Sequence, residues 1–387
     1  TESNRMRTAL VVSLTLLASL PSLAVAQVCS GCAGTPVNLN DTGGFLWDLS
    51  NGGSVCNGTS DAFDGHWTVF VDGQEYTALQ AGSELNGRQL VFAAQPLGAL
   101  EVERRVYVPD VGSAFARYYD TFTNTTASVV SATVDYTSNL GSDGSTTIWG
   151  SSDGDAVPTS ADTWWGTDDV DGAGDPSLAF NVWDGAAQAP AAVHTAPCGV
   201  GSTSAQFQIV VAPGETVALV TFTTQASDQA SAQAGATNLA TTPTEAHEGL
   251  TARQKFQTLN WDLPIEVLVI YDTASEGTPA LVAALTNAGY DVTLSDSEEI
   301  SYFGINPAPT GFDTVVHLNG HVTYQTDMPS QGQAALVSYV QNGGGFVHFE
   351  WNAYELDTQN RMQGMTDLTL LVRTQGQSGN RTIAQVA

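Results

Sequence analysis

The sequence predicts a mixed fold with two domains, an antiparallel β-sandwich followed by an α/β domain built on a parallel sheet. A length of 387 residues suits two domains. From about residue 40 to 225, short alternating or β-branched runs are broken by Gly, Asn, Asp and Ser, with no helical period. From residue 264 onward, continuous apolar runs alternate with helical patterns instead. The change in pattern therefore predicts a change of fold class near Pro264.

The first domain is expected over 27–225, as a sandwich of many short antiparallel strands. Pro213-Gly214 separates two of these runs and is a hairpin signal. The segment 226–263 is rich in Ala, Gln and Thr, and we interpret it as a linker or packing helix that closes the domain. The strands expected here are His66–Val71, Leu100–Val108, Phe115–Phe122, Val129–Tyr136, Gln206–Val211 and Thr216–Thr224.

The second domain, 264–387, alternates strand and helix. Its strands are apolar throughout, which is typical of a parallel sheet covered by helices on its faces. Gly289 and the run 343–345 follow the two helices, where glycine commonly ends a helix. The predicted strands are Ile265–Tyr271, Asp291–Leu294, Phe312–Leu318 and Phe346–Phe349, and the helices begin at Thr278 and Ser330.

The string FDTVVHLNG, a helix ending in YVQNGGG, and the string FVHFEWNA form a recognisable series. Together they resemble the ThuA-like (trehalose-utilisation) family of the class I glutamine amidotransferase-like superfamily. The resemblance covers about residues 264–355. It implies a flavodoxin-like, doubly wound sheet and a carbohydrate-related role.

The departures from that family are informative. Amidotransferases place a Cys nucleophile after the fourth strand, and this sequence has no Cys beyond Cys198. ThuA-like domains usually read GGGFVGIH here, and Glu350 occupies the position of that His. We therefore expect a degenerate domain without amidotransferase chemistry. The family domain normally extends further, so this one is expected to be an incomplete fragment.

Ligands of parallel α/β sheets bind outside the carboxyl ends of the strands. These ends form a candidate ligand cleft, in which His321 and Glu350 could serve as base and acid. The favoured interpretation is that these polar residues are capping and turn residues of a non-catalytic module. His317 and His348 lie inside apolar strands and are interpreted as core residues. The cleft residues are Asp272, Asn319, His321, Glu350 and Asn352.

The chain carries 40 acidic and 11 basic residues, for a net charge of −29. Such acidity argues against a nucleic-acid or anionic-membrane partner, because both require clustered Lys and Arg. Segment 141–175 has eight Asp and no cation. Asp169, Asp171 and Asp175 resemble a calcium loop, so calcium is the one cofactor considered, against an ordinary acidic turn. The adjacent Trp164-Trp165 is either a sugar-stacking platform or, as favoured, part of the core.

The N-terminus reads as a secretory signal peptide, with Met6-Arg7, an apolar run and a cleavage site after Ala26. We therefore expect a secreted or periplasmic protein of bacterial style, with no membrane insertion after cleavage. Four cysteines in an exported chain favour two disulfides with the pairing left open. They are Cys29, Cys32, Cys56 and Cys198.

Three functions remain open from the sequence. The favoured one is a non-catalytic pair of modules that binds carbohydrate or another surface polymer. A second is a sugar-modifying hydrolase that uses the α/β cleft. A third is a calcium-stabilised structural part of a larger cell-surface protein.

Overall fold

The computed structural model describes residues 32–368 except 198, 200, 276, 321 and 324, and leaves out the side chains of Glu350 and Asp357. These residues divide into two compact units, one holding most of the chain up to Leu263 and the other the chain from Pro264. The predicted signal peptide lies outside the described residues. Among the described helices, none is long and apolar enough to cross a membrane.

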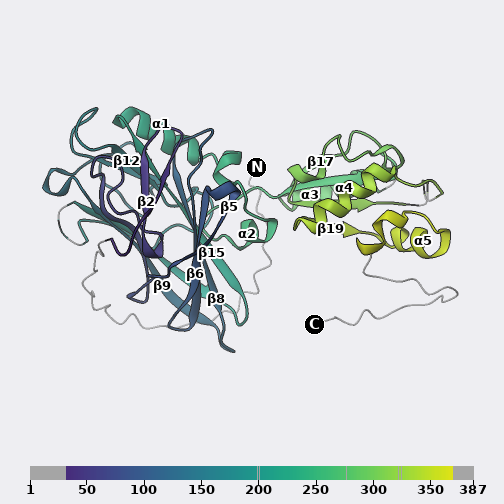
Figure 1. The fold of residues 1–387 in the computed structure, drawn as a ribbon, viewed down its shortest axis with the longest axis horizontal. Coiled ribbons are helices and arrows are strands. Elements are labelled where there is room, and N and C mark those ends of the chain that lie inside the picture. The colour runs from purple at the N-terminus through teal and green to yellow at the C-terminus, as the bar shows by residue number, and fades with distance from the viewer. Residues whose placement is uncertain are drawn as a thin grey trace. The chain divides into compact units, whose positions relative to one another are not determined.

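The first unit, labelled in Figure 1, is built from two antiparallel sheets, as the alternating pattern predicts. The eight-stranded sheet has the order β10-β11-β12-β15-β8-β7-β6-β5 and the five-stranded sheet the order β13-β14-β9-β3-β4. A short hairpin of β1 and β2 adds to them. The strands are β1 (Val37–Asn40), β2 (Leu46–Leu49), β3 (Phe63–Val71), β4 (Gln74–Glu75), β5 (Gln80–Glu84), β6 (Gln89–Leu97), β7 (Leu100–Tyr107), β8 (Ala116–Asn124), β9 (Val130–Leu140), β10 (Thr147–Ser151), β11 (Trp164–Asp168), β12 (Ser177–Asn181), β13 (Ala192–Thr195), β14 (Ser202–Val211) and β15 (Thr216–Ala226).

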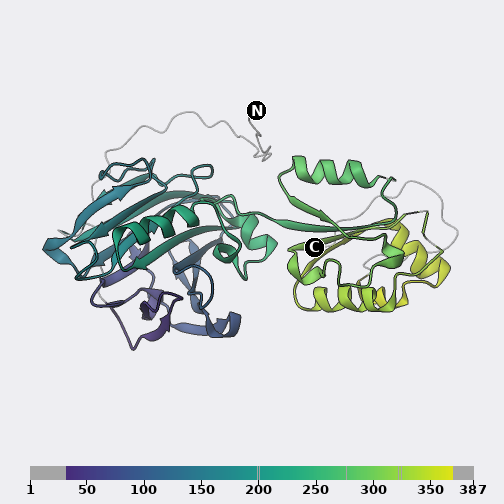
Figure 2. The same ribbon diagram turned by 90° about the horizontal axis from the view of Figure 1, so that it is seen from above.

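Both faces of the eight-stranded sheet are covered. On its inner face, Leu219 of β15 packs in a core shared with Val134 and Phe207 of the other sheet. On its outer face, Val220 and Phe222 pack with residues of the segment after β15, including Trp261. That segment carries α1 (Gln229–Leu239) and α2 (Ala252–Gln257), and α1 lies across β12 and β15 (Figure 2). Residues 226–263 are therefore packed against the sheet, and most of them are not an open linker.

Trp164 and Trp165 belong to the core of this unit. Trp165 is fully buried and packs against Phe180, while Trp164 packs with small residues of α1. The sugar-stacking platform considered from the sequence is therefore wrong for this pair, because neither ring offers an open face.

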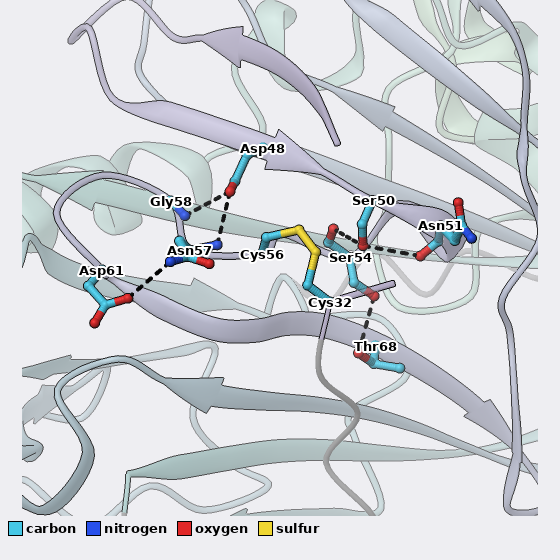
Figure 3. Close-up of a disulfide and its surroundings, with 10 residues drawn as sticks. All are labelled: Cys32, Asp48, Ser50, Asn51, Ser54, Cys56, Asn57, Gly58, Asp61 and Thr68. Atoms are coloured by element: carbon cyan, nitrogen blue, oxygen red, sulfur yellow. Dashed lines mark hydrogen bonds between the residues drawn. A yellow bond between two sulfur atoms is a disulfide. The ribbon is translucent and has the colours of Figure 1, made fainter. Parts of the chain in front are cut away.

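A disulfide joins Cys32 to Cys56 and ties the start of the described chain to the loop before β3 (Figure 3). The side chain of Asp48 fixes the same loop by accepting hydrogen bonds from the backbone of Asn57 at 3.1 Å and Gly58 at 2.7 Å. The prediction of disulfides is confirmed for this pair. Cys29 and Cys198 lie outside the described residues.

The second unit is a four-stranded parallel sheet of order β17-β16-β18-β19, with helices on both faces (Figure 2). Alternate residues of β16 explain the two layers. Val267 and Val269 face α3, whereas Leu268 and Ile270 face α4 and α5. The predicted parallel sheet is confirmed. Its elements are β16 (Glu266–Tyr271), α3 (Thr278–Asn287), β17 (Asp291–Leu294), β18 (Thr314–Leu318), α4 (Ser330–Gln341), β19 (Gly345–His348) and α5 (Glu350–Gln359).

A buried ion pair within the eight-stranded sheet is hydrogen-bonded to the opposite sheet of the first unit. Arg104 on β7 and Asp120 on β8 face each other in register, are fully buried, and form two hydrogen bonds of 2.7 and 3.0 Å. Tyr136 of the opposite sheet donates to Asp120 at 2.9 Å. Arg104 also donates to the backbone carbonyl of Trp67 at 2.6 Å.

We expect Asp120→Asn to lower the free energy of unfolding of this unit by about 3–5 kcal/mol, because it leaves the Arg104 charge buried without its counter-ion. Urea unfolding followed by Trp fluorescence measures the change. The matched control is Asp110→Asn, whose carboxylate is 63% exposed and 4.0 Å from Arg88. The control should change stability by less than about 0.5 kcal/mol. Equal effects of the two substitutions would contradict this account of the core.

Candidate functional site

Polar side chains gather at the carboxyl ends of the parallel strands in the second unit. Asp272 directly follows β16, Asn319 directly follows β18, and α5 begins directly after β19 with Asn352 in its first turn. All three are almost completely buried. Of the other two residues expected in the cleft, His321 lies outside the described residues, and Glu350 starts α5 with a side chain that is not described.

The structure adds residues that the sequence did not indicate. Glu299, Thr323 and Glu355 are also buried at this end, together with the imidazole of His317 near the end of β18. Every side chain of the set is at most 6% exposed. We call this set the polar cluster: Asp272, Glu299, His317, Asn319, Thr323, Asn352 and Glu355.

Asp272 anchors the loop after β18. Its carboxylate accepts hydrogen bonds from the backbone of Val322 at 3.0 Å and of Thr323 at 2.7 Å, and from the Thr323 hydroxyl. A Cβ at position 320 would lie 2.4 Å from Asp272 Oδ2, so only glycine fits where the loop passes the carboxylate. The glycine of the Asn319-Gly320 turn therefore allows this loop to close over Asp272.

Glu299 connects this anchor to His317. Glu299 Oε1 contacts the Thr323 hydroxyl, and Oε2 lies 2.6 Å from His317 Nε2. Thr323 has one hydroxyl hydrogen and two carboxyl neighbours, so it can donate to only one of them at a time. The contacts Asp272–Thr323–Glu299–His317 thus form one continuous chain, in which Glu299 fixes the orientation of the imidazole.

Glu355 has an unusual protonation state. Asn319 Nδ2 donates to Glu355 Oε2 at 2.6 Å, and Glu355 itself is fully buried. Burial raises the pKa of the Glu355 carboxyl to about 8, with a further contribution from the charge of Glu299. The carboxyl is therefore largely protonated at neutral pH, so it can donate a hydrogen bond as well as accept one.

The cluster leaves five buried polar atoms without a hydrogen-bond partner among the described residues. Each such atom costs about 1–3 kcal/mol of desolvation that nothing in the described structure offsets. Native proteins leave few buried polar groups unsatisfied, so a concentration of them indicates a place where a water or a ligand binds. The atoms are His317 Nδ1, Asn319 Oδ1, Asn352 Nδ2, Asn352 Oδ1 and Glu355 Oε1.

The residues that were not identified from the sequence differ in how strongly the sequence pattern indicates them. Glu355 lies three residues after Asn352, so a helix in that place puts both on one face. No helix is predicted from the sequence after β19, so Glu355 does not stand out there. Glu299 lies in a segment with no pattern to mark it. His317 was interpreted as a core residue; it is buried, and only its Nε2 has a partner in the described structure.

The candidate calcium loop, Asp169 to Asp175, lies elsewhere, in the turn between β11 and β12. Asp171 accepts a hydrogen bond at 2.9 Å from the backbone of Gln229 at the start of α1. Partial burial, and then the nearby Asp169, raise the pKa of Asp175. No group of three or more His, Cys, Asp or Glu side chains in the described parts of the chain is arranged to hold a metal ion. Asp169, Asp171 and Asp175 therefore do not form such a group there.

Comparison with known proteins finds no matching family model and no matching curated protein. Among solved structures, a polysaccharide lyase is 13% identical with a TM-score of 0.29, over 53% of this chain and 34% of that one. A heparan sulfate lyase from Pedobacter heparinus is 11% identical with a TM-score of 0.31, over 47% and 33%. A protein from Synechocystis is 8% identical with a TM-score of 0.36, over 51% and 100%. The chain spans about a third of the length of the two lyases.

We expect the stability of the second unit to fall as pH rises from about 4.5 to 8. In this window Glu355 keeps its proton in the folded unit but loses it in the unfolded chain, whose pKa is near the ordinary 4.5. Stability then falls by up to about 1.4 kcal/mol per pH unit and levels off above pH 8. The variant Glu355→Gln, which cannot ionise, should lack this slope.

Urea unfolding at a series of pH values measures the effect as the difference between the wild type and Glu355→Gln. Asp291→Asn changes an exposed carboxylate of the same unit and serves as the control. The wild type and the control should lose stability in parallel while Glu355→Gln does not. If all three proteins have the same pH dependence, Glu355 is not the buried acid described here.

Proposed function

We propose that this chain is an exported protein whose second unit binds a carbohydrate through the polar cluster, without nucleophilic catalysis. We further propose that this unit is a flavodoxin-like, ThuA-like domain. The strand order β17-β16-β18-β19 supports this, because it matches the first four strands of a doubly wound 2-1-3-4-5 sheet. The absence of Cys after residue 198 fits a domain of this kind that does not use thiol chemistry.

The observation that carries the proposal is the set of five unpartnered polar atoms. The set includes both donors and acceptors, since the Asn352 amide offers one of each and the protonated Glu355 can donate. A sugar hydroxyl both donates and accepts, so a ligand with several hydroxyls matches such a mixed set. An apolar ligand would leave these atoms unsatisfied and gains nothing from them.

The burial of the cluster sets a condition on binding. Its side chains are at most 6% exposed, so a ligand larger than water reaches them only when a covering segment moves. The loop after β18 covers Asp272 and is held there by Val322 and Thr323. Binding should therefore be slower than diffusion and should be accompanied by a local change in this loop.

A second candidate function is acid–base chemistry on a bound sugar. Its supporting observations are His317, which Glu299 orients at 2.6 Å, and Glu355 in the same polar cluster, which is protonated at neutral pH. A base and an acid of this kind are what hydrolysis requires. For this candidate we propose His317 and Glu355 in the roles of base and acid, for which the sequence suggested His321 and Glu350. Release of reducing sugar by the wild type and its loss in His317→Gln would favour this candidate.

Export is supported by the Cys32–Cys56 disulfide, since such bonds persist in oxidising compartments. The excess of 40 acidic over 11 basic residues also suits an exported, soluble surface.

Titration calorimetry with a panel of mono- and disaccharides tests the proposed binding. We expect Asn352→Leu to weaken binding at least about tenfold, because it removes two hydrogen-bonding atoms aimed at the ligand. The variant should unfold at the same or a higher temperature than the wild type, since a buried unpartnered amide is replaced by an apolar side chain of similar size.

Asn287→Leu makes the same chemical change at an exposed position at the end of α3 and should leave binding unchanged. Two results would contradict the proposal. One is that no sugar of the panel binds the wild type. The other is that Asn352→Leu binds as the wild type does.

A further inference from the structure

The charges around Glu355 restrict which carbohydrate the polar cluster can take. The charges of Glu299, Asp327 and Asp272 act on it from three different segments, namely the 3₁₀ helix η5 (Glu299–Ser301), the segment before α4 and the end of β16, and His317 lies on β18. Among the described cations, Arg361 is the one that follows α5, and it pairs with Asp327 at 3.3 Å. No second described cation takes part in the cluster. The site is therefore acidic, and its single neighbouring cation is already paired.

The hydrogen-bond pattern between Asn319 and Glu355 is half complete. Asn319 Nδ2 donates to Glu355 Oε2, but Asn319 Oδ1 and Glu355 Oε1 have no partner. A carboxylic acid and an amide can close a ring of two hydrogen bonds, and here only one of the two is made. One hydroxyl group placed beside the pair would complete the pattern, accepting from the acid at Oε1 and donating to the amide at Oδ1.

The amide of Asn352 can form a hydrogen bond with a second hydroxyl of the ligand. It lies three residues before Glu355 on α5, so the two side chains project from the same face of the helix. Both polar atoms of its amide are buried and unpartnered. A hydroxyl on the carbon next to the first one can accept from Nδ2 or donate to Oδ1.

Resting on the proposed function, we infer that the polar cluster selects an uncharged sugar, with one hydroxyl of a vicinal diol between Glu355 and Asn319 and its neighbour on Asn352. An anionic sugar is excluded because its carboxylate would be buried among other carboxyl groups. Among the described residues, no unpaired cation is present at the site to balance that charge. The same arrangement links binding to the proton on Glu355. Loss of that proton removes the donor and adds a buried negative charge.

Calorimetric titration of the full chain with D-glucose, D-glucuronate and D-glucosamine between pH 6 and 9 tests this inference. The three probes share the ring and most hydroxyls but differ in charge. We expect D-glucose to bind at least about tenfold more tightly than D-glucuronate at pH 7. Its affinity should fall above pH 8, approaching about tenfold per pH unit.

Glu355→Gln keeps the shape of the protonated acid and still offers a donor, but it cannot ionise. It should bind D-glucose at pH 7 with an affinity within about threefold of the wild type and show no loss above pH 8. The pH profile of the wild type is informative even if this variant does not fold.

The outcomes separate the two proposals. If none of the three probes binds, the proposed function and this inference both fail. If D-glucose binds but D-glucuronate binds as well, or the affinity is independent of pH, only this inference is overturned. If D-glucosamine binds more tightly than D-glucose at pH 7, where its amine is a cation, Glu355 acts as an anion that pairs with the ammonium group, which also overturns it.

Discussion

Burying a polar atom is unfavourable unless the atom finds a hydrogen-bond partner, and both units of this chain bury polar side chains under that constraint. In the β-sandwich, the buried Arg104 is matched by Asp120, which in turn accepts from Tyr136 of the opposite sheet. His66 is likewise held between two hydroxyls, Ser138 and Thr223. These networks stabilise the packing of one sheet on the other and leave the ion pair no spare atom to offer a ligand.

In the α/β unit the same constraint is only partly met. Asp272 is fully engaged in holding its loop, whereas Asn319, Asn352 and Glu355 keep unpartnered atoms. These atoms lie at the carboxyl ends of the parallel strands, where ligands of such sheets bind, which is why we assign them to a ligand. Burial accounts for both properties of the site, because it makes the empty positions costly and keeps the Glu355 carboxyl protonated near neutral pH.

Much of this architecture could be predicted from the sequence, because strands leave a direct signal. Alternating polar and apolar residues indicated β7 and β9, because one face of such a strand is buried. Runs of mainly apolar residues indicated β16 and β18, because both faces of such a strand are buried. The rule that ligands bind after parallel strands drew attention to Asp272, Asn319 and Asn352. Glu355 was not identified because α5, with the sequence EWNAYELDTQ, lacks the apolar stripe that usually indicates a helix. Glu299 starts the short 3₁₀ helix η5 (Glu299–Ser301), and no local pattern in the sequence indicates it.

A crystal structure of the protein grown near pH 7 in the presence of D-glucose tests the central claim most directly. The account predicts a sugar in the polar cluster, with one hydroxyl within about 3 Å of both Glu355 Oε1 and Asn319 Oδ1, and a neighbouring hydroxyl on the Asn352 amide. Ordered water molecules that satisfy all five atoms, with no sugar bound, would contradict it. The cluster would then be a hydrated structural network of the α/β unit.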